Sequence, residues 1–156
     1  METPERISLV LACRELDAHD TGFELLGSVA ELLRTRLTHS EVESYTQILD
    51  EEIRHGVRGE IDEEALNAKQ SYLANRSGRR VRAQFDLYRE VSFTSTAAEY
   101  MHGLWHDVQI RIGPEHLPVA QLRRRMDLMA QLFPPNEGYR LFDESVEKTD
   151  GISDSK

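Results

Sequence analysis

Cysteine is almost absent from this chain, with Cys13 the only one among 156 residues. An internal disulfide is therefore impossible, and a cysteine-based zinc ribbon is excluded as well. No apolar run approaches the ~20 residues that a membrane-spanning helix needs. The first five residues include two acids and lack the basic start of a secretory signal. These absences predict a cytoplasmic protein with no membrane partner.

The glycine-rich motifs that cradle phosphates and dinucleotides are also missing, as is the Gly-x-Ser-x-Gly elbow of many serine hydrolases. What remains is a globular composition, 39% hydrophobic and 30% charged. This length favours a single domain, which we place at residues 1–142. The small and charged residues of 143–156 predict a disordered acidic tail.

The net charge of −9 is unevenly distributed along the chain. Residues 76–125 are locally basic, with nine arginines against five acidic residues, inside an otherwise acidic sequence. Two arginine clusters stand out as candidate interaction residues: Arg79, Arg80, Arg82, Arg123, Arg124 and Arg125. We favour internal neutralisation, in which this block packs against the acidic first half. A nucleic-acid surface is the alternative, which the acidic total disfavours.

The first half of the chain is expected to be helical, because apolar residues recur there with a period close to 3.6. A first helix is predicted over 4–17, with Thr21 as the N-cap of a second. Ser40 is expected to cap a third helix, with Glu43 at the capping-box spacing, and Asp62 a fourth.

The second half changes to alternation of apolar and polar residues, which is typical of strands. We therefore predict two long antiparallel strands over 80–93 and 99–112, joined by a hairpin loop at 94–98. A last helix is predicted to begin at Pro118 and end before Pro134, and a short strand is predicted over 139–142. The expected fold is α+β, with the C-terminal helix packed on the sheet. An all-α bundle is the alternative, in which 96–110 is helical.

Two histidines of this second half share a face. His102 and His106 are four residues apart, so they point the same way on a helix and on a strand. Paired imidazoles can hold a divalent transition metal, and a carboxylate such as Glu99 could add an oxygen. The candidate metal ligands are His102, His106, His55 and Glu99. The alternative is a pair of half-buried, hydrogen-bonded sheet histidines.

The run from His102 to Ile110 resembles the His-x3-His-x2-Gln-Ile segment of DinB-like metal-binding helical bundles. The resemblance implies a helical bundle in which His55 is the third metal ligand. The chain departs from the family's pattern before this run, where the sequence alternates instead of showing a helical stripe.

Taken together, these features favour a small non-catalytic binding or regulatory protein that acts through protein–protein contacts, self-associates and needs no cofactor. One alternative is a metal-dependent enzyme, a hydrolase or oxidase, built on His102 and His106. The other is a nucleic-acid-binding protein that uses the arginines of 76–125.

Overall fold

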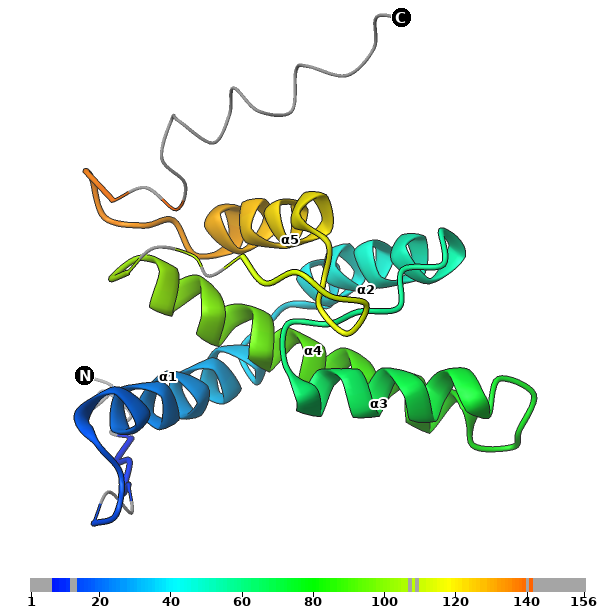
Figure 1. Cartoon of the computed structure of the whole chain (residues 1–156), viewed down its shortest axis with the longest axis horizontal. Coiled ribbons are helices and arrows are strands. Elements are labelled where there is room, and N and C mark those ends of the chain that lie inside the picture. Colours follow the sequence, from blue (N-terminus) through cyan, green and yellow to red (C-terminus); the bar gives the residue numbers. More distant parts are fainter. Residues whose placement is uncertain (1–6, 12–13, 107, 109, 140, 142–156) are drawn as a thin grey trace, which may run out of the picture.

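The fold is all-α throughout the part of the chain that the structure describes. The computed structural model describes residues 7–11, 14–106, 108, 110–139 and 141. Within them lie five helices (Figure 1): α1 Ala18–Arg34, α2 His39–Arg54, α3 Glu63–Ala74, α4 Val81–Gly103 and α5 Val119–Leu132. The expected α+β fold is wrong, and the all-α alternative is the one that matches.

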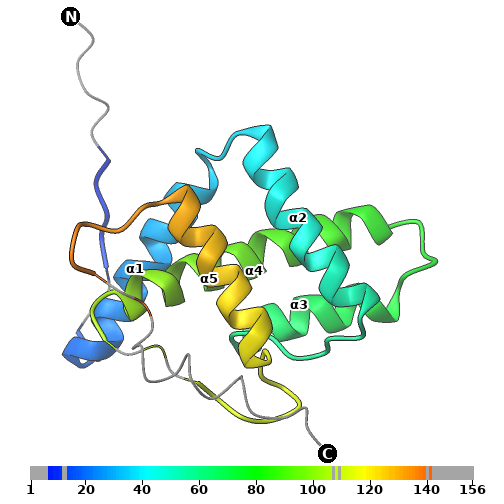
Figure 2. The same cartoon turned by 90° about the horizontal axis from the view of Figure 1, so that it is seen from above.

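Helix α4 is the centre of the arrangement, since it contacts each of the other four helices. Helices α1 and α3 lie one after the other along α4, while α2 and α5 cross on its opposite side (Figures 1 and 2). The apolar core follows this plan: Tyr88, Phe93 and Ala97 of α4 are buried, with Leu49 of α2 and Met126 of α5.

The predicted hairpin over 80–93 and 99–112 is replaced by α4, and the predicted loop at 94–98 lies inside that helix. The buried face of α4 repeats every three to four residues, through Tyr88, Ser92, Thr96 and Tyr100. Two of these residues are small and polar, so a pattern based on apolar residues alone does not reveal the stripe. The alternation that suggested a strand puts Leu87 on the apolar face, but the Leu87 side chain is 55% exposed in the structure.

Several helix boundaries also differ from those expected. Asp62 caps α3 as predicted. The capping box of α2, however, is formed by Thr38 and Glu41 and not by Ser40 and Glu43. The N-cap of α1 is Asp17, earlier than the predicted Thr21.

Two short elements predicted near the chain ends are corrected as well. Residues 7–11 and 14–17 are not helical, so the helix expected over 4–17 does not form there. Residues 139 and 141 belong to no strand, although a strand was expected over 139–142. The predicted tail, 143–156, lies outside the described residues.

A single bridge joins the two long connections of the fold. The backbone of Glu60, between α2 and α3, bonds to the segment between α4 and α5: the amide of Glu60 donates to Glu115 (3.0 Å), and the amide of Leu117 donates to Glu60 (2.9 Å). The chains approach so closely that a Cβ on Gly59 would lie 1.9 Å from the carbonyl oxygen of His116. Glycine is required at this crossing, which places Glu60 in the interior.

None of the described helices combines the length and apolar character needed to cross a membrane.

Candidate functional site

The most polar cluster of the molecule lies in its core, around Arg125 of α5. The guanidinium donates to the carboxylates of two residues, Glu52 of α2 (Nε to Oε1, 3.0 Å) and Glu60 (Nη1 to Oε2, 2.7 Å; Nη2 to Oε1, 2.9 Å). A further bond reaches the Ser92 hydroxyl of α4 (2.9 Å). Arg125 is fully buried, and both glutamates are 2% exposed or less. One side chain thus ties three elements together.

Glu60 receives a second set of donors from the opposite side. The Lys69 ammonium of α3 donates to Glu60 Oε1 (3.1 Å) and to the Gly59 carbonyl (3.0 Å), and the Tyr88 hydroxyl also donates to Oε1. Two carboxylates therefore face one guanidinium and one ammonium. Four buried charges are tolerated in a protein core only when they are paired and hydrogen-bonded.

These surroundings set the pKa of each titratable group. Burial alone would raise the pKa of Glu60, but the adjacent Arg125 charge and its hydrogen bonds, with Lys69, hold it at about 2. Burial lowers the pKa of Lys69, and the attraction of Glu60 opposes that effect. Burial also raises the pKa of Tyr45, whose hydroxyl bonds to Ser92 and Thr96, to about 12.

This cluster has the character of a structural network. Its members come from α2, α3, α4, α5 and the connection before α3, and Arg125, Glu60 and Lys69 have 0% exposure. Perturbed carboxylates in an open cleft would suggest acid–base catalysis, but these are closed off from solvent. The network fixes how four helices pack.

A second cluster lies where α1 begins and α4 ends, and it contains both predicted histidines. The ring of His102 is 5.2 Å from that of His106 and 5.7 Å from that of His19 of α1, measured between ring centroids. The Phe23 ring, also on α1, lies 5.2 Å from His102. His19 and His106 are exposed, whereas His102 is only 6% exposed. Both views place these two helix ends side by side (Figures 1 and 2).

His102 is the anomalous member of this histidine cluster, which we define as His19, His102 and His106. Both of its ring nitrogens are buried without a hydrogen-bond partner among the described residues. A buried polar group left unpaired typically costs about 1–3 kcal/mol. A histidine that only packs in the core at position 102 would therefore destabilise the fold. The predicted alternative of hydrogen-bonded sheet histidines is wrong, because there is neither a sheet nor such a bond in this part of the structure.

Carboxylates stand beside this cluster at the start of α1. The ligand atoms of Asp17, His19 and Asp20 all lie within 4.8 Å of one another. The Asp20 carboxylate is 3.7 Å from Nδ1 of His19, and Asp17 accepts a hydrogen bond from the Asp20 amide as the helix N-cap (2.8 Å). The sequence patterns did not single out His19 or the two aspartates as candidate ligands.

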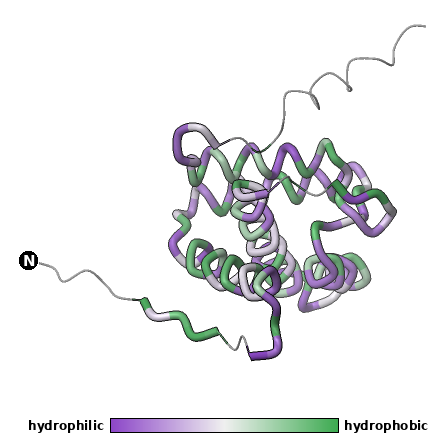
Figure 3. Tube along the Cα trace, turned by 60° about the vertical axis from the view of Figure 1, so that its left-hand side comes forward, coloured by the Kyte–Doolittle hydropathy of each residue, from purple (hydrophilic) through white to green (hydrophobic). Residues whose placement is uncertain are grey.

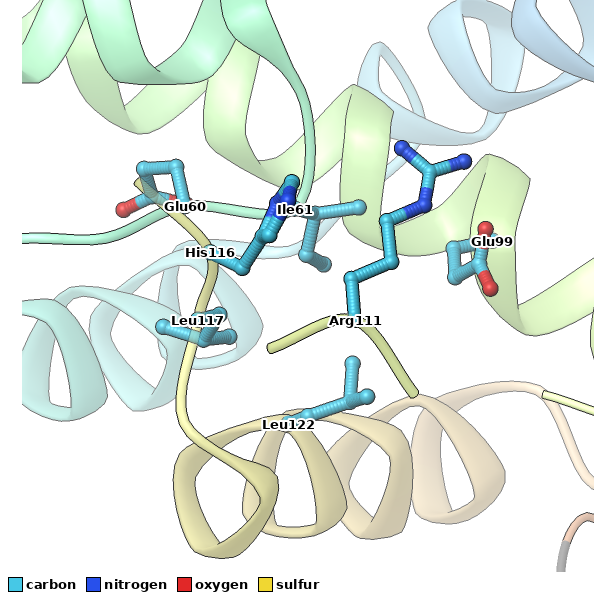
Figure 4. Close-up of a pocket in the computed structure, with 7 residues that line it drawn as sticks. All are labelled: Glu60, Ile61, Glu99, Arg111, His116, Leu117 and Leu122. Carbon is cyan, nitrogen blue, oxygen red and sulfur yellow. The ribbon is translucent and has the colours of Figure 1, made fainter. Parts of the chain in front are cut away.

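The other two predicted metal ligands lie elsewhere. His55 is the C-cap of α2, where its Nδ1 is 2.7 Å from the Glu51 carbonyl. That end of α2 is on the opposite side of the molecule from the end of α4 (Figures 1 and 2). Glu99 lines a small pocket with Arg111, which reaches up between Ile61 and Glu99 (Figure 4). The structure therefore brings together His102 and His106 but does not bring His55 to them.

The predicted arginine clusters are divided in the same way. Arg79, Arg80 and Arg82 are exposed around the start of α4. Arg124 pairs with Glu51, and Arg125 is buried against Glu52 and Glu60. Internal neutralisation is thus confirmed for Arg124 and Arg125. Arg123 is half-buried on the same helix.

Exposed apolar side chains are frequent in the segment that includes the start of α1. Eleven large hydrophobic side chains are exposed among the described residues; six of them lie between residues 7 and 25, and a seventh, Trp105, follows the end of α4. We call these seven the apolar surface: Ile7, Leu9, Val10, Leu16, Phe23, Leu25 and Trp105. Residues 7–11 form an extended apolar arm beside the helical body (Figure 3). Val10 is 95% exposed and Trp105 65%.

Comparison of the chain with protein families, with curated proteins and with solved structures found no match to any of them. The resemblance to DinB-like bundles thus has no family match behind it, and α4 ends at Gly103, inside the run that carries the resemblance.

Proposed function

We propose that this chain is a non-catalytic binding protein that acts by protein–protein association, and that its partner is a second copy of itself. The observation that supports it is the run of exposed large hydrophobic side chains on the arm and the first half of α1, where six of the eleven among the described residues lie between residues 7 and 25. Scattered apolar side chains are normal on a surface, whereas a gathering of them marks an interaction site.

The extended arm is the part of this surface that gains most from a partner. Ile7, Leu9 and Val10 are 49%, 42% and 95% exposed in the single chain. Val10 and Leu16 line a groove with Glu24 and Ser28 of α1, which is apolar on one wall. We expect the apolar side chains of a second copy's arm to pack against Val10 and Leu16 along this groove.

A two-fold dimer would use the same surface on both copies. Burying the three arm residues of each copy would contribute on the order of 10 kcal/mol, at about 1.5–3 kcal/mol for each fully buried side chain. That is comparable with the roughly 4–15 kcal/mol that association costs in lost freedom. With Phe23 and Trp105 added, the balance favours a dimer that dissociates on dilution.

Sedimentation velocity of the full chain over a concentration series tests this proposal. The wild type should approach twice the 17.9 kDa of one chain, and Leu9→Asp/Val10→Asp should remain monomeric with an unchanged helical circular-dichroism spectrum. The matched control is Leu87→Asp/Ile112→Asp, whose side chains are 55% and 94% exposed and lie outside the apolar surface, and this variant should dimerise like the wild type. A monomeric wild type at high concentration, or equal loss in both variants, would refute the proposal.

The two alternative functions have less support. Of the six candidate arginines, Arg79, Arg80 and Arg82 are exposed around the start of α4, whereas Arg124 and Arg125 pair with carboxylates of this chain. The carboxylate-rich cluster that an enzyme could use is sealed in the core. We place the protein in the cytoplasm, since a chain with one cysteine gains nothing from an oxidising compartment.

A further inference from the structure

The anomaly at His102 has a simple chemical solution. Its buried ring has two nitrogens without hydrogen-bond partners in the described part of the chain, and two further imidazoles, His19 and His106, pack against it. Aromatic rings pack at such distances without any ion. Packing alone, however, would be served better by phenylalanine, which has no nitrogen to leave unpaired. A histidine at position 102 is therefore explained by a ligand for its nitrogens and not by packing.

We propose that His19, His102 and His106 bind a divalent transition metal of the zinc class, with the Asp20 carboxylate beside them. The proposal does not depend on self-association, because every ligand comes from one chain. Neutral imidazoles with a carboxylate are the donor set that Zn²⁺ prefers when thiolates are absent.

The ring centroids of the histidine cluster have the spacing that this ion needs, and the ring nitrogens must turn to reach it: among the described residues, the ligand atoms that already lie within 4.8 Å of one another are those of Asp17, His19 and Asp20. A zinc–nitrogen bond of about 2.0–2.1 Å puts each imidazole centroid about 3.2 Å from the metal, so two rings in a tetrahedral site are about 5.2 Å apart. The His102 ring lies 5.2 Å from the His106 ring and 5.7 Å from the His19 ring. His19 and His106 are exposed, so their rings can turn their nitrogens towards the ion without disturbing the core.

Asp20 can serve in two ways at this site, both favourable. Its Oδ1 is 3.7 Å from Nδ1 of His19, which leaves Nε2 of His19 for the metal. A carboxylate behind a ligating histidine fixes its tautomer and raises its basicity. Alternatively, with Asp17 close by, Asp20 can supply the fourth ligand, since the ligand atoms of all three residues lie within 4.8 Å.

The chain itself offers a matched control. Four of its histidines are exposed: His19 and His106 belong to the cluster, while His39 and His55 do not. Untagged, chelator-treated protein is titrated with Zn²⁺ by calorimetry, in three forms: wild type, His19→Ala/His106→Ala and His39→Ala/His55→Ala. We expect one Zn²⁺ per chain in the wild type, unchanged affinity in the control, and at least about 100-fold weaker binding in the cluster variant.

A fourth form separates metal binding from packing. His102→Phe keeps an aromatic ring against Phe23, so it should fold, but it removes the buried ligand. Zn²⁺ should raise the melting temperature of the wild type and leave that of His102→Phe unchanged. Absence of stoichiometric Zn²⁺ binding by the wild type would overturn the proposal, as would loss of binding in the His39/His55 variant with retention in the His19/His106 variant.

Discussion

Replacement of Arg125 by methionine is the most informative perturbation of the core. Methionine fills part of the space but supplies no charge. The buried carboxylates of Glu52 and Glu60 therefore lose four hydrogen bonds from the guanidinium, and the Ser92 hydroxyl loses one. Removing one partner of a buried ion pair costs about 3–5 kcal/mol, since it leaves an uncompensated charge.

The pKa of Glu60 bears on the same cluster. Its pKa falls from an ordinary 4.5 to about 2 in the folded protein, with Arg125 the largest of the attractive influences on it. All of its surroundings together thus contribute about 3 kcal/mol of stabilisation at neutral pH. A domain of this kind is stable by only about 5–15 kcal/mol, so Arg125→Met should remove a large part of the total.

Urea unfolding followed by circular dichroism measures this cost. Arg125→Lys keeps the charge but not the forked geometry, so it should fall between methionine and wild type. The loss in Arg125→Met should shrink at acidic pH, because Glu60 can then become protonated and no longer needs a counter-charge. A loss below about 1 kcal/mol at neutral pH would refute a network in which Arg125 holds two buried carboxylates.

Two further predictions concern acid stability and the close crossing of the two long connections. Folding lowers the pKa of Glu60 to about 2, so the stabilisation that its carboxylate contributes is fully present above the unfolded value near 4.5 and is lost as the pH falls towards 2. Acid unfolding monitored by circular dichroism should therefore begin below about pH 4.5. Glu60→Gln should flatten that pH dependence. Gly59→Ala should lower the melting temperature sharply, since its Cβ would meet the His116 carbonyl at 1.9 Å. Gly27→Ala, inside α1 with nothing within 4 Å, should instead stabilise the protein by about 0.5–1 kcal/mol. Equal effects of the two substitutions in calorimetry would contradict the described crossing.

The helical elements that could be predicted from the sequence are those with local signals. Asp62 begins α3 and Pro118 precedes α5, as their positions ahead of apolar stripes indicated. For α2 the correct motif was recognised at the wrong residue, because Thr38 and Ser40 both have a glutamate three residues later. Cap residues that lie this close can only be distinguished by how the helix packs.

Helix α4 was missed for a tertiary reason. Ser92 and Thr96 are polar as single residues, yet both are completely buried, because Arg125, Glu60 and Tyr45 provide their hydrogen-bond partners. Those partners come from distant parts of the chain. An apolar periodicity has no means of anticipating a polar stripe that faces a polar core.

The two clusters differ in how much the sequence indicated. His102 and His106 were identified because four-residue spacing puts them on one face, but His19 comes from another helix and only the fold brings it near. Lys69 did leave a local signal, since it lies on the apolar face of α3 between Ala65 and Tyr72. A lysine in such a position is most often paired with a buried acid, here Glu60.

The central proposal is that the chain self-associates through the apolar surface that includes the arm. The most direct measurement is the mass of the wild-type chain in solution, followed by sedimentation from high to low concentration. The account predicts a species of twice 17.9 kDa that dissociates on dilution. A mass of one chain at every concentration would contradict it.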